Sequence, residues 1–438
     1  MMQKVRFAYF NVLALAFACS LSALAQTLGN NITVTVTPDH KDWNYKMGET
    51  AAFRVCVLKS GTLLDGAAIS FEKGPEMYPD DKGDMTLKDG STVIKGKMNK
   101  PGFYRLKVTA HVGGRDYTGT CTAAFSPEQI VATTQNPDDF DEFWTKTLEQ
   151  ARWTSLEPKL ELLPERCTPA VNTYHVSFQN DKWDRRVYGI LCVPTAPGKY
   201  PALLRVPGAG VRPYTGDPWT AAKGVIVLEI GIHGIPVTNP QEYYDNLFST
   251  ALADYWTYSI NNRERCYYKH VITGAARAID YIASLKEWDG QNLGVAGSSQ
   301  GGFLTLAMAA LDKRVTCYAP VHAAMCDYEA ALKKVACGWP HYFYNYADPN
   351  TTLKADPAEV ENTRYYDGVN FARRITCPGW FSFGYNDDVV PPTTAYATYN
   401  AVTAPKEVHP YPQTAHFWYQ EQWDEWQAWL LGKLGVRS

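Results

Sequence analysis

Residues 31–125 alternate apolar and polar side chains in short runs that are separated by turn-forming sequences. Alternation with a period of two predicts strands with one buried face, and the glycine, proline and aspartate between the runs favour tight turns. The runs cover residues 32–36, 52–58, 68–71, 91–98, 103–111 and 117–125. Strands at this spacing, without helical periods, predict a small antiparallel β-sandwich over residues 27–125. It contains no set of catalytic residues, so we expect an accessory module.

The pattern changes after Ser126, where strand-like and helical periods begin to alternate. Residues 136–148 predict a helix, with Pro137 and several acids in its first turn and apolar residues at helical spacing. Strands are expected at residues 187–193, 202–206, 224–230, 292–297, 315–321, 379–383 and 407–411, and helices between or behind them. Repeated strand–helix alternation predicts a mostly parallel sheet with helices on both faces, in a second domain over residues 126–438.

Length and composition agree with two globular domains. A chain of 438 residues exceeds the size at which one hydrophobic core usually stops growing. Hydrophobic residues make up 45% and charged residues 20%, which excludes wholesale disorder. The net charge of −3 predicts no strong attraction to nucleic acid or to an anionic membrane.

The N-terminus has the pattern of a cleavable export signal. Lys4 and Arg6 precede an apolar run over residues 7–18, and Ala23-Leu24-Ala25 forms a small-x-small cleavage site. The run is shorter than the ~20 apolar residues that a membrane span needs. We therefore expect residues 1–25 to be a signal peptide, cleavage near Ala25 with export to the periplasm or the exterior, and no membrane insertion.

The ten cysteines occur singly, without C-x-x-C pairs, so thiolate metal binding is not expected. Most lie in apolar strand-like or helical contexts, where a free cysteine behaves as a small core residue. Cys56 and Cys121 both lie in the first domain, where an oxidising compartment would allow a bridge between them.

The sequence Gly297-Ser298-Ser299-Gln300-Gly301 matches G-x-S-x-G and has the context that gives this motif meaning. A buried strand over residues 293–296 leads into it and an apolar helix over residues 303–311 follows it. The glycines are needed because a β-carbon two residues before or after the serine would collide with the tight turn. Only Ser299 has glycine at both places. This arrangement predicts a nucleophile elbow, and with the strand–helix alternation it indicates an α/β-hydrolase fold.

A serine hydroxyl needs a general base, and the base needs an acid that orients it, in the chain order Ser, Asp or Glu, His. The predicted strand 379–383 runs into a loop that carries Asp387 and Asp388, and chemistry alone does not choose between them. His409 lies inside the last predicted strand, whereas His416 lies in the loop after it and is free to reach over the sheet edge. The pattern favours His416 as the base.

Several segments of the second domain resemble the acetyl xylan esterase and cephalosporin C deacetylase family of α/β hydrolases. The resemblance covers about residues 136–438 and omits the first domain. It rests on residues 136–144, Tyr267-Tyr268-Lys269-His270, Gly297-Ser298-Ser299-Gln300-Gly301-Gly302, Cys326-Asp327-Tyr328, residues 365–372, Asp387-Asp388-Val389-Val390-Pro391-Pro392, and Tyr411-Pro412 with His416.

The resemblance implies that Asp387 is the acid and His416 the base. It also implies a serine esterase that removes acetyl groups from carbohydrate through an acyl-enzyme, without a metal or organic cofactor, and it allows a homo-oligomer. Another α/β-hydrolase activity, such as that of a peptidase or a lactonase, is the enzymatic alternative. A carbohydrate-binding protein with a relict site is the non-enzymatic one.

The tetrahedral intermediate needs hydrogen-bond donors for its oxyanion. We expect one from the backbone N–H of Gln300, directly after the nucleophile, and the second from the loop after residues 202–206. Pro207 has no N–H, which leaves Gly208 or Ala209. The family carries a tyrosine where Ala209 aligns, and its arginine–glycine–glutamine signature appears here as His233-Gly234-Ile235. His233 is expected to be structural or to line a pocket.

The C-terminus is rich in tryptophan. Trp418, Trp423, Trp426 and Trp429 fit one face of a helix, which favours core packing over stacking against a sugar.

Overall fold

The computed structural model describes residues 31–436, so the predicted leader lies outside the described residues. The chain divides into two compact units. Of the described residues, the first contains residues 31–74, Pro79–Asn99 and Tyr104–Ala123; the second contains Pro75–Tyr78, Lys100–Phe103 and residues 124–436. None of the helices between residues 31 and 436 is long and apolar enough to cross a membrane.

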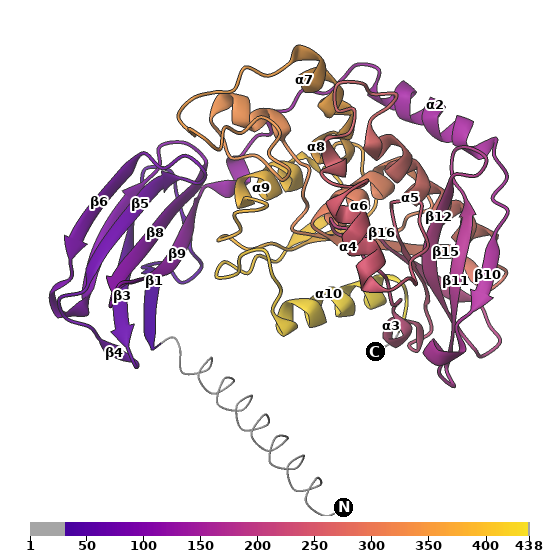
Figure 1. The fold of residues 1–438 in the computed structure, drawn as a ribbon, viewed down its shortest axis with the longest axis horizontal. Helices are drawn as coiled ribbons and strands as arrows, with labels where there is room; N and C mark the ends of the chain where they lie inside the picture. Colours follow the sequence, from indigo (N-terminus) through magenta and orange to yellow (C-terminus); the bar gives the residue numbers. More distant parts are fainter. Residues whose placement is uncertain (1–30, 437–438) are drawn as a thin grey trace, which may run out of the picture. The chain divides into compact units, whose positions relative to one another are not determined.

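The first unit consists of two sheets, as the alternating pattern predicted (Figure 1). Residues 32–38 and residues 91–97 both pair antiparallel with residues 50–59, and residues 68–75 pair antiparallel with residues 81–86. One sheet contains β1 (Ile32–Pro38), β3 (Thr50–Lys59), β4 (Thr62–Leu63) and β7 (Ser91–Lys97). The other has the order β2 (Asn44–Tyr45), β9 (Arg115–Phe125), β8 (Gly102–Val112), β5 (Ala68–Pro75), β6 (Asp81–Thr86). Buried residues alternate along β3, which gives that sheet one apolar face.

The hydrophobic pattern did not predict three strands of this unit, which are short or polar. Strand β6 covers Asp81-Lys82-Gly83, which lie between the predicted runs 68–71 and 91–98. It is a largely exposed edge strand that pairs with β5. Strands β2 and β4 have two residues each, too few to show a period. Cys56 and Cys121 are both free.

The second unit is built on a nine-stranded sheet with the α/β-hydrolase fold. The strands in spatial order are β10 (Lys159–Leu162), β11 (Val171–Gln179), β12 (Arg186–Pro194), β14 (Ile226–Ile230), β13 (Tyr200–Arg205), β15 (Trp288–Ser298), β16 (Cys317–Val321), β17 (Gly379–Phe381) and β18 (Lys406–Val408). All neighbours from β14 to β18 are parallel. The pairs β10–β11, β11–β12 and β12–β14 are antiparallel.

The sequence pattern missed β10 and β11 at the antiparallel edge of this sheet. Every residue of β10 is exposed, so no apolar alternation marks it. Strand β11 mixes polar residues with apolar ones. The predicted start of the first helix was also slightly wrong, because α2 (Phe140–Arg152) begins after Asp139 and Pro137 lies before its first turn.

Two groups of helices sandwich the sheet (Figure 1). Leu203, Cys317 and Ala319 share an apolar core with α10 (Gln420–Lys433), and Ala221 of α3 (Pro218–Ala221) belongs to the same core. Helices α5 (Tyr267–Ser284) and α6 (Gln300–Leu311) pack against the strands as well, and most residues of both are buried. The remaining α-helices are α4 (Gln241–Ser249), α7 (Pro357–Thr363), α8 (Gly368–Ala372) and α9 (Pro392–Ala401).

The C-terminal tryptophans pack in the core, as expected. Trp426 is fully buried in α10, and Trp418, Trp423 and Trp429 pack against the same cluster. Trp418 lies before the helix begins at Gln420, so it is not part of the predicted helical face.

Candidate active site

Ser299 lies on a strained turn between β15 and α6. Its backbone angles, φ 60° and ψ −124°, fall in a region that side-chain-bearing residues rarely adopt. The turn is held on both sides, because the Ser299 N–H donates to the carbonyl of Val321 (2.9 Å) and the N–H of Ala324 donates to the Ser299 carbonyl (3.1 Å). This is the strand–turn–helix geometry that exposes a nucleophile at the carboxyl edge of a parallel sheet.

The two motif glycines are required by the close approach of one carbonyl group. A β-carbon on Gly297 would lie 2.5 Å from the carbonyl oxygen of Val206, and one on Gly301 would lie 2.3 Å from the same atom. Both distances are far below van der Waals contact. The glycines therefore let the segment after β13 run directly beside the turn that carries Ser299.

Asp387 lies in the loop between β17 and α9 and is fully buried. Its Oδ1 accepts hydrogen bonds from the N–H groups of Val389 (3.0 Å) and Val390 (2.8 Å). Its Oδ2 lies 2.7 Å from Nδ1 of His416. Burial acts to raise the pKa of the Asp387 carboxyl, but hydrogen bonds from His322 and His416 outweigh it and hold that pKa well below its usual range. The carboxyl is therefore ionised at neutral pH.

His416 and Ser299 line one cavity of about 780 Å³. His416 comes from the loop between β18 and α10, and Phe248, Trp256 and Trp339 form part of the apolar wall around it. The two alternative candidates do not take part in this arrangement. Asp388 is exposed. His409 follows the last residue of β18 and contacts Glu407 (3.4 Å) and Glu425 (3.8 Å).

The expected oxyanion donors are unused within the described chain. The N–H groups of Gln300, Gly208 and Ala209 have no hydrogen-bond acceptor among residues 31–436, whereas that of Gly210 donates to Tyr255. A β-carbon on Gly208 would lie 4.0 Å from Cβ of Ser299, so this loop passes next to Ser299.

The side chain of Gln300 joins the two donor segments. It is fully buried, and its Oε1 accepts hydrogen bonds from the hydroxyls of Tyr255 (2.7 Å) and Tyr268 (2.8 Å). Its Nε2 donates to the carbonyl of Pro207 (3.3 Å). One side chain thus ties the start of α6 to the loop that carries Gly208, a role that the motif alone does not reveal.

His233 has a structural place, as expected. Its Nε2 lies 3.0 Å from the carbonyl oxygen of Gly210 and its Nδ1 lies 2.7 Å from the hydroxyl of Tyr267. Burial lowers the pKa of His233 to about 4, so the ring is neutral. It therefore holds the far end of the Pro207–Gly210 loop.

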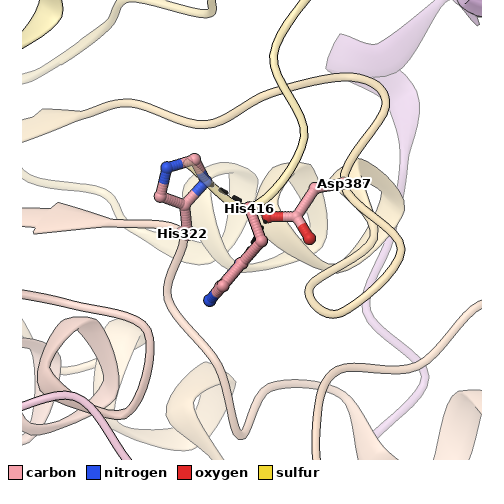
Figure 2. Close-up of side chains that lie close together, drawn as sticks. All are labelled: His322, Asp387 and His416. Atoms are coloured by element: carbon pink, nitrogen blue, oxygen red, sulfur yellow. Dashed lines mark hydrogen bonds and ion pairs between the residues drawn. The ribbon is translucent and has the colours of Figure 1, made fainter. Parts of the chain in front are cut away.

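A second histidine, which was not predicted to belong to the site, also contacts the Asp387 carboxylate. Figure 2 shows His322, Asp387 and His416 together. His322 follows β16 directly, and its Nδ1 lies 3.2 Å from Oδ2 of Asp387. The expected chain order of Ser, Asp or Glu, and His excludes His322 as the base, because it precedes Asp387 in the chain. The only sequence signal was its position at the carboxyl end of a parallel strand, where such sheets carry their chemistry.

These three residues are also the only group of histidine, cysteine, aspartate and glutamate side chains between residues 31 and 436 that is close enough to surround a metal ion. The 2.7 Å separation of His416 Nδ1 and Asp387 Oδ2 is that of a charge-assisted hydrogen bond. A hydrogen bond between His416 and Asp387 therefore explains why these two side chains lie so close together.

Comparison with known proteins identifies the family. The model of the acetyl xylan esterase (AXE1) family matches residues 128–432, which is most of the chain. Acetyl esterase Axe7A of Xylanibacter ruminicola is 38% identical over 404 residues, which cover 90% of this chain and 89% of that protein. The chain belongs to the acetyl xylan esterase family. Membership makes it an esterase and hence a hydrolase, and the similarity to Axe7A extends into the first unit.

Solved structures of family members share the fold of the second unit. The acetyl xylan esterase from Paenibacillus sp. R4 superposes with a TM-score of 0.59 and 24% identity, over 70% of this chain and 98% of that one. Acetyl xylan esterase 1 from Thermoanaerobacterium sp. JW/SL YS485 gives a TM-score of 0.57 and 23% identity, over 70% and 97%.

Proposed function

We propose that this protein is a serine esterase that removes acetyl groups from carbohydrate through an acyl-enzyme. One observation carries the proposal: Ser299, on its strained turn, opens into the same cavity as His416, whose Nδ1 is hydrogen-bonded to the buried carboxylate of Asp387. Family membership and the name of the 38%-identical relative, an acetyl esterase, support acetyl as the group removed.

In the proposed reaction Ser299 is the nucleophile and His416 the general base. Because Nδ1 of His416 donates to Asp387, Nε2 of the neutral ring is free to take the proton of the serine hydroxyl. Oγ then bonds to the ester carbonyl carbon, and the carbonyl electron pair moves to the oxygen. Collapse of this intermediate expels the sugar oxygen, which receives the proton from His416, and water repeats the sequence to release acetate.

The developing oxyanion would be bound by the N–H of Gln300 together with that of Gly208 or Ala209. Their freedom from other acceptors in the described chain supports this assignment. Losing one such donor typically costs ~3 kcal/mol of transition-state stabilisation.

We also propose that residues 1–25 direct export and are removed. The charged head, short apolar run and Ala23-Leu24-Ala25 support this, and N-terminal sequencing of the exported protein should begin near Gln26.

Two measurements test the proposed function. Acetate release from a panel of acetylated glycans should show turnover of acetylated xylan, and a fluorophosphonate should form a single adduct on Ser299. A protein with a relict site would leave Ser299 unlabelled, and cleavage of peptides or lactones without acetate release would favour another hydrolase activity.

A further inference from the structure

His322 is a buried polar side chain that the proposed reaction does not use. The side chain is 1% exposed, and its Nδ1 lies 3.2 Å from Oδ2 of Asp387, outside good hydrogen-bond geometry. Its Nε2 has no hydrogen-bond partner between residues 31 and 436. A buried imidazole with so few polar contacts is costly, so its orientation needs an explanation. The Asp387 Oδ2 atom, 3.2 Å from Nδ1, is the contact that provides one.

The chemistry of the two groups determines which one donates. Burial lowers the pKa of His322, although Asp387 acts in the opposite direction, so the ring is neutral near pH 7. An ionised carboxylate only accepts hydrogen bonds, so Nδ1 of His322 carries the proton and donates it. Oδ2 of Asp387 is then shared between His416, at 2.7 Å, and His322, at the longer distance and poorer angle.

Sharing this oxygen affects His416. Each hydrogen bond that a carboxylate accepts stabilises its negative charge and lowers its ability to attract a further proton. A carboxylate that already accepts from Val389, Val390 and His322 therefore draws the His416 proton less strongly. Without His322, Asp387 would stabilise the protonated form of His416, which is inactive as a base, more strongly than it does in its presence.

We propose that His322 is a positioning residue that holds the Asp387 carboxylate and extends the activity of the His416 base to lower pH. The proposal rests on the proposed function, because it concerns the same base. His322 acts on His416 through Asp387.

The other groups around His322 do not replace this contact. The His416 ring lies 5.1 Å from the His322 ring and Trp418 lies 6.1 Å from it, centroid to centroid, on the loop before α10. Asp388 is exposed on the Asp387 loop. His341 lies near the same loop, and burial lowers its pKa to about 4, so it carries no charge near pH 7.

The test compares donor-bearing and donor-free substitutions at one position. In His322→Asn the side-chain nitrogen stands as many bonds from Cα as Nδ1 does, and asparagine tolerates the local φ of 45°. His322→Ala and His322→Leu lack a donor, and leucine fills more of the ring volume should alanine fail to fold. His409→Ala removes a half-buried histidine that also lies beside carboxylates and serves as the control.

The measurement is the pH profile of kcat/KM for a small soluble acetyl ester. We expect the acid limb to move up by about one pH unit in the donor-free variants, the scale of shift that one hydrogen bond to a charged group produces. The Asn variant and His409→Ala should keep the wild-type limb. An unmoved limb with a lower kcat in His322→Ala or His322→Leu would reduce His322 to a packing residue, and a shift in His322→Asn equal to that in His322→Ala would refute the donor role.

These failures differ from failure of the proposed function. If Ser299 were not the nucleophile, the Ser299→Ala variant would hydrolyse the ester as the wild type does. If only the role of His322 were wrong, that activity would still depend on Ser299 and the acid limb alone would fail to move.

Discussion

The carbonyl oxygen of Val206 approaches Gly301 so closely that a β-carbon there would lie 2.3 Å from it. This contact brings together two segments that are far apart in sequence. Val206 leads into the loop with Gly208 and Ala209, and Gly301 belongs to the first turn of α6, directly after Gln300. The distance between the two expected oxyanion donors is therefore set by a position that cannot carry a side chain.

Gly301→Ala should push these segments apart. We expect kcat/KM to fall about 10²–10³-fold, the loss that removal of one oxyanion donor produces, and stability to fall by about 1–3 kcal/mol from overpacking. Acetate release and thermal unfolding measure the two effects. Gly432→Ala, in α10 with nothing within 4 Å of the added carbon, should leave both unchanged or slightly improve stability. Normal kcat/KM in Gly301→Ala would show that the close approach does not position the donors.

Asp387→Asn should abolish most activity while Asp388→Asn does not. The buried Asp387 is hydrogen-bonded to His416, and its amide analogue would present the wrong hydrogen-bonding pattern to Nδ1, at an expected cost of about 10⁴ in kcat. Asp388 is exposed and its loss should change kcat less than twofold. Steady-state hydrolysis of one acetyl ester compares them, and the reverse ranking would move the acid to Asp388.

Gln300→Ala should lower both stability and kcat. It leaves the hydroxyls of Tyr255 and Tyr268 without their shared acceptor and opens the link to Pro207. We expect a loss of about 2–4 kcal/mol in the free energy of unfolding, from a small cavity and unsatisfied buried polar groups, and a fall in kcat larger than any rise in KM. Gln291→Ala, at an exposed position, controls for the general effect of the substitution. An unchanged kcat would mean that the Gln300 side chain only packs.

The acyl preference should fall from acetyl to propionyl, butyryl and hexanoyl. The Gly208 segment passes beside Ser299, and a wall formed there would penalise each added methylene by ~1–3 kcal/mol. Ala209, where the family has tyrosine, is the position that could relieve the restriction. Values of kcat/KM for the four esters of one leaving group decide the point, and a maximum at butyryl or beyond would favour a broader esterase.

Much of the architecture could be predicted from the sequence, because burial of an element produces a recognisable pattern of apolar residues. The parallel strands on either side of Ser299 are buried apolar runs, and their order with the helices indicated the fold. Strands β6 and β10 were missed because exposed, polar segments carry no such signal. Their pairing depends on neighbours that are known only in three dimensions.

The site was predictable to the extent that local rules apply to it. The glycines around Ser299 and the loop position of His416 follow from local geometry, and the structure brings His416 to Asp387. The contact of His322 with Asp387 and the bonds of Gln300 were not predictable, because each joins segments whose separation in sequence gives no indication of contact.

Acetate release from acetylated xylan by Ser299→Ala and Ser298→Ala, both folded, tests the central claim most directly. We expect Ser299→Ala to lose at least ~10³ in kcat, leaving only binding and oxyanion stabilisation, and Ser298→Ala to stay within a few-fold of the wild type. If Ser298→Ala were the inactive variant, or if Ser299→Ala kept its activity, the elbow and the mechanism built on it would be wrong.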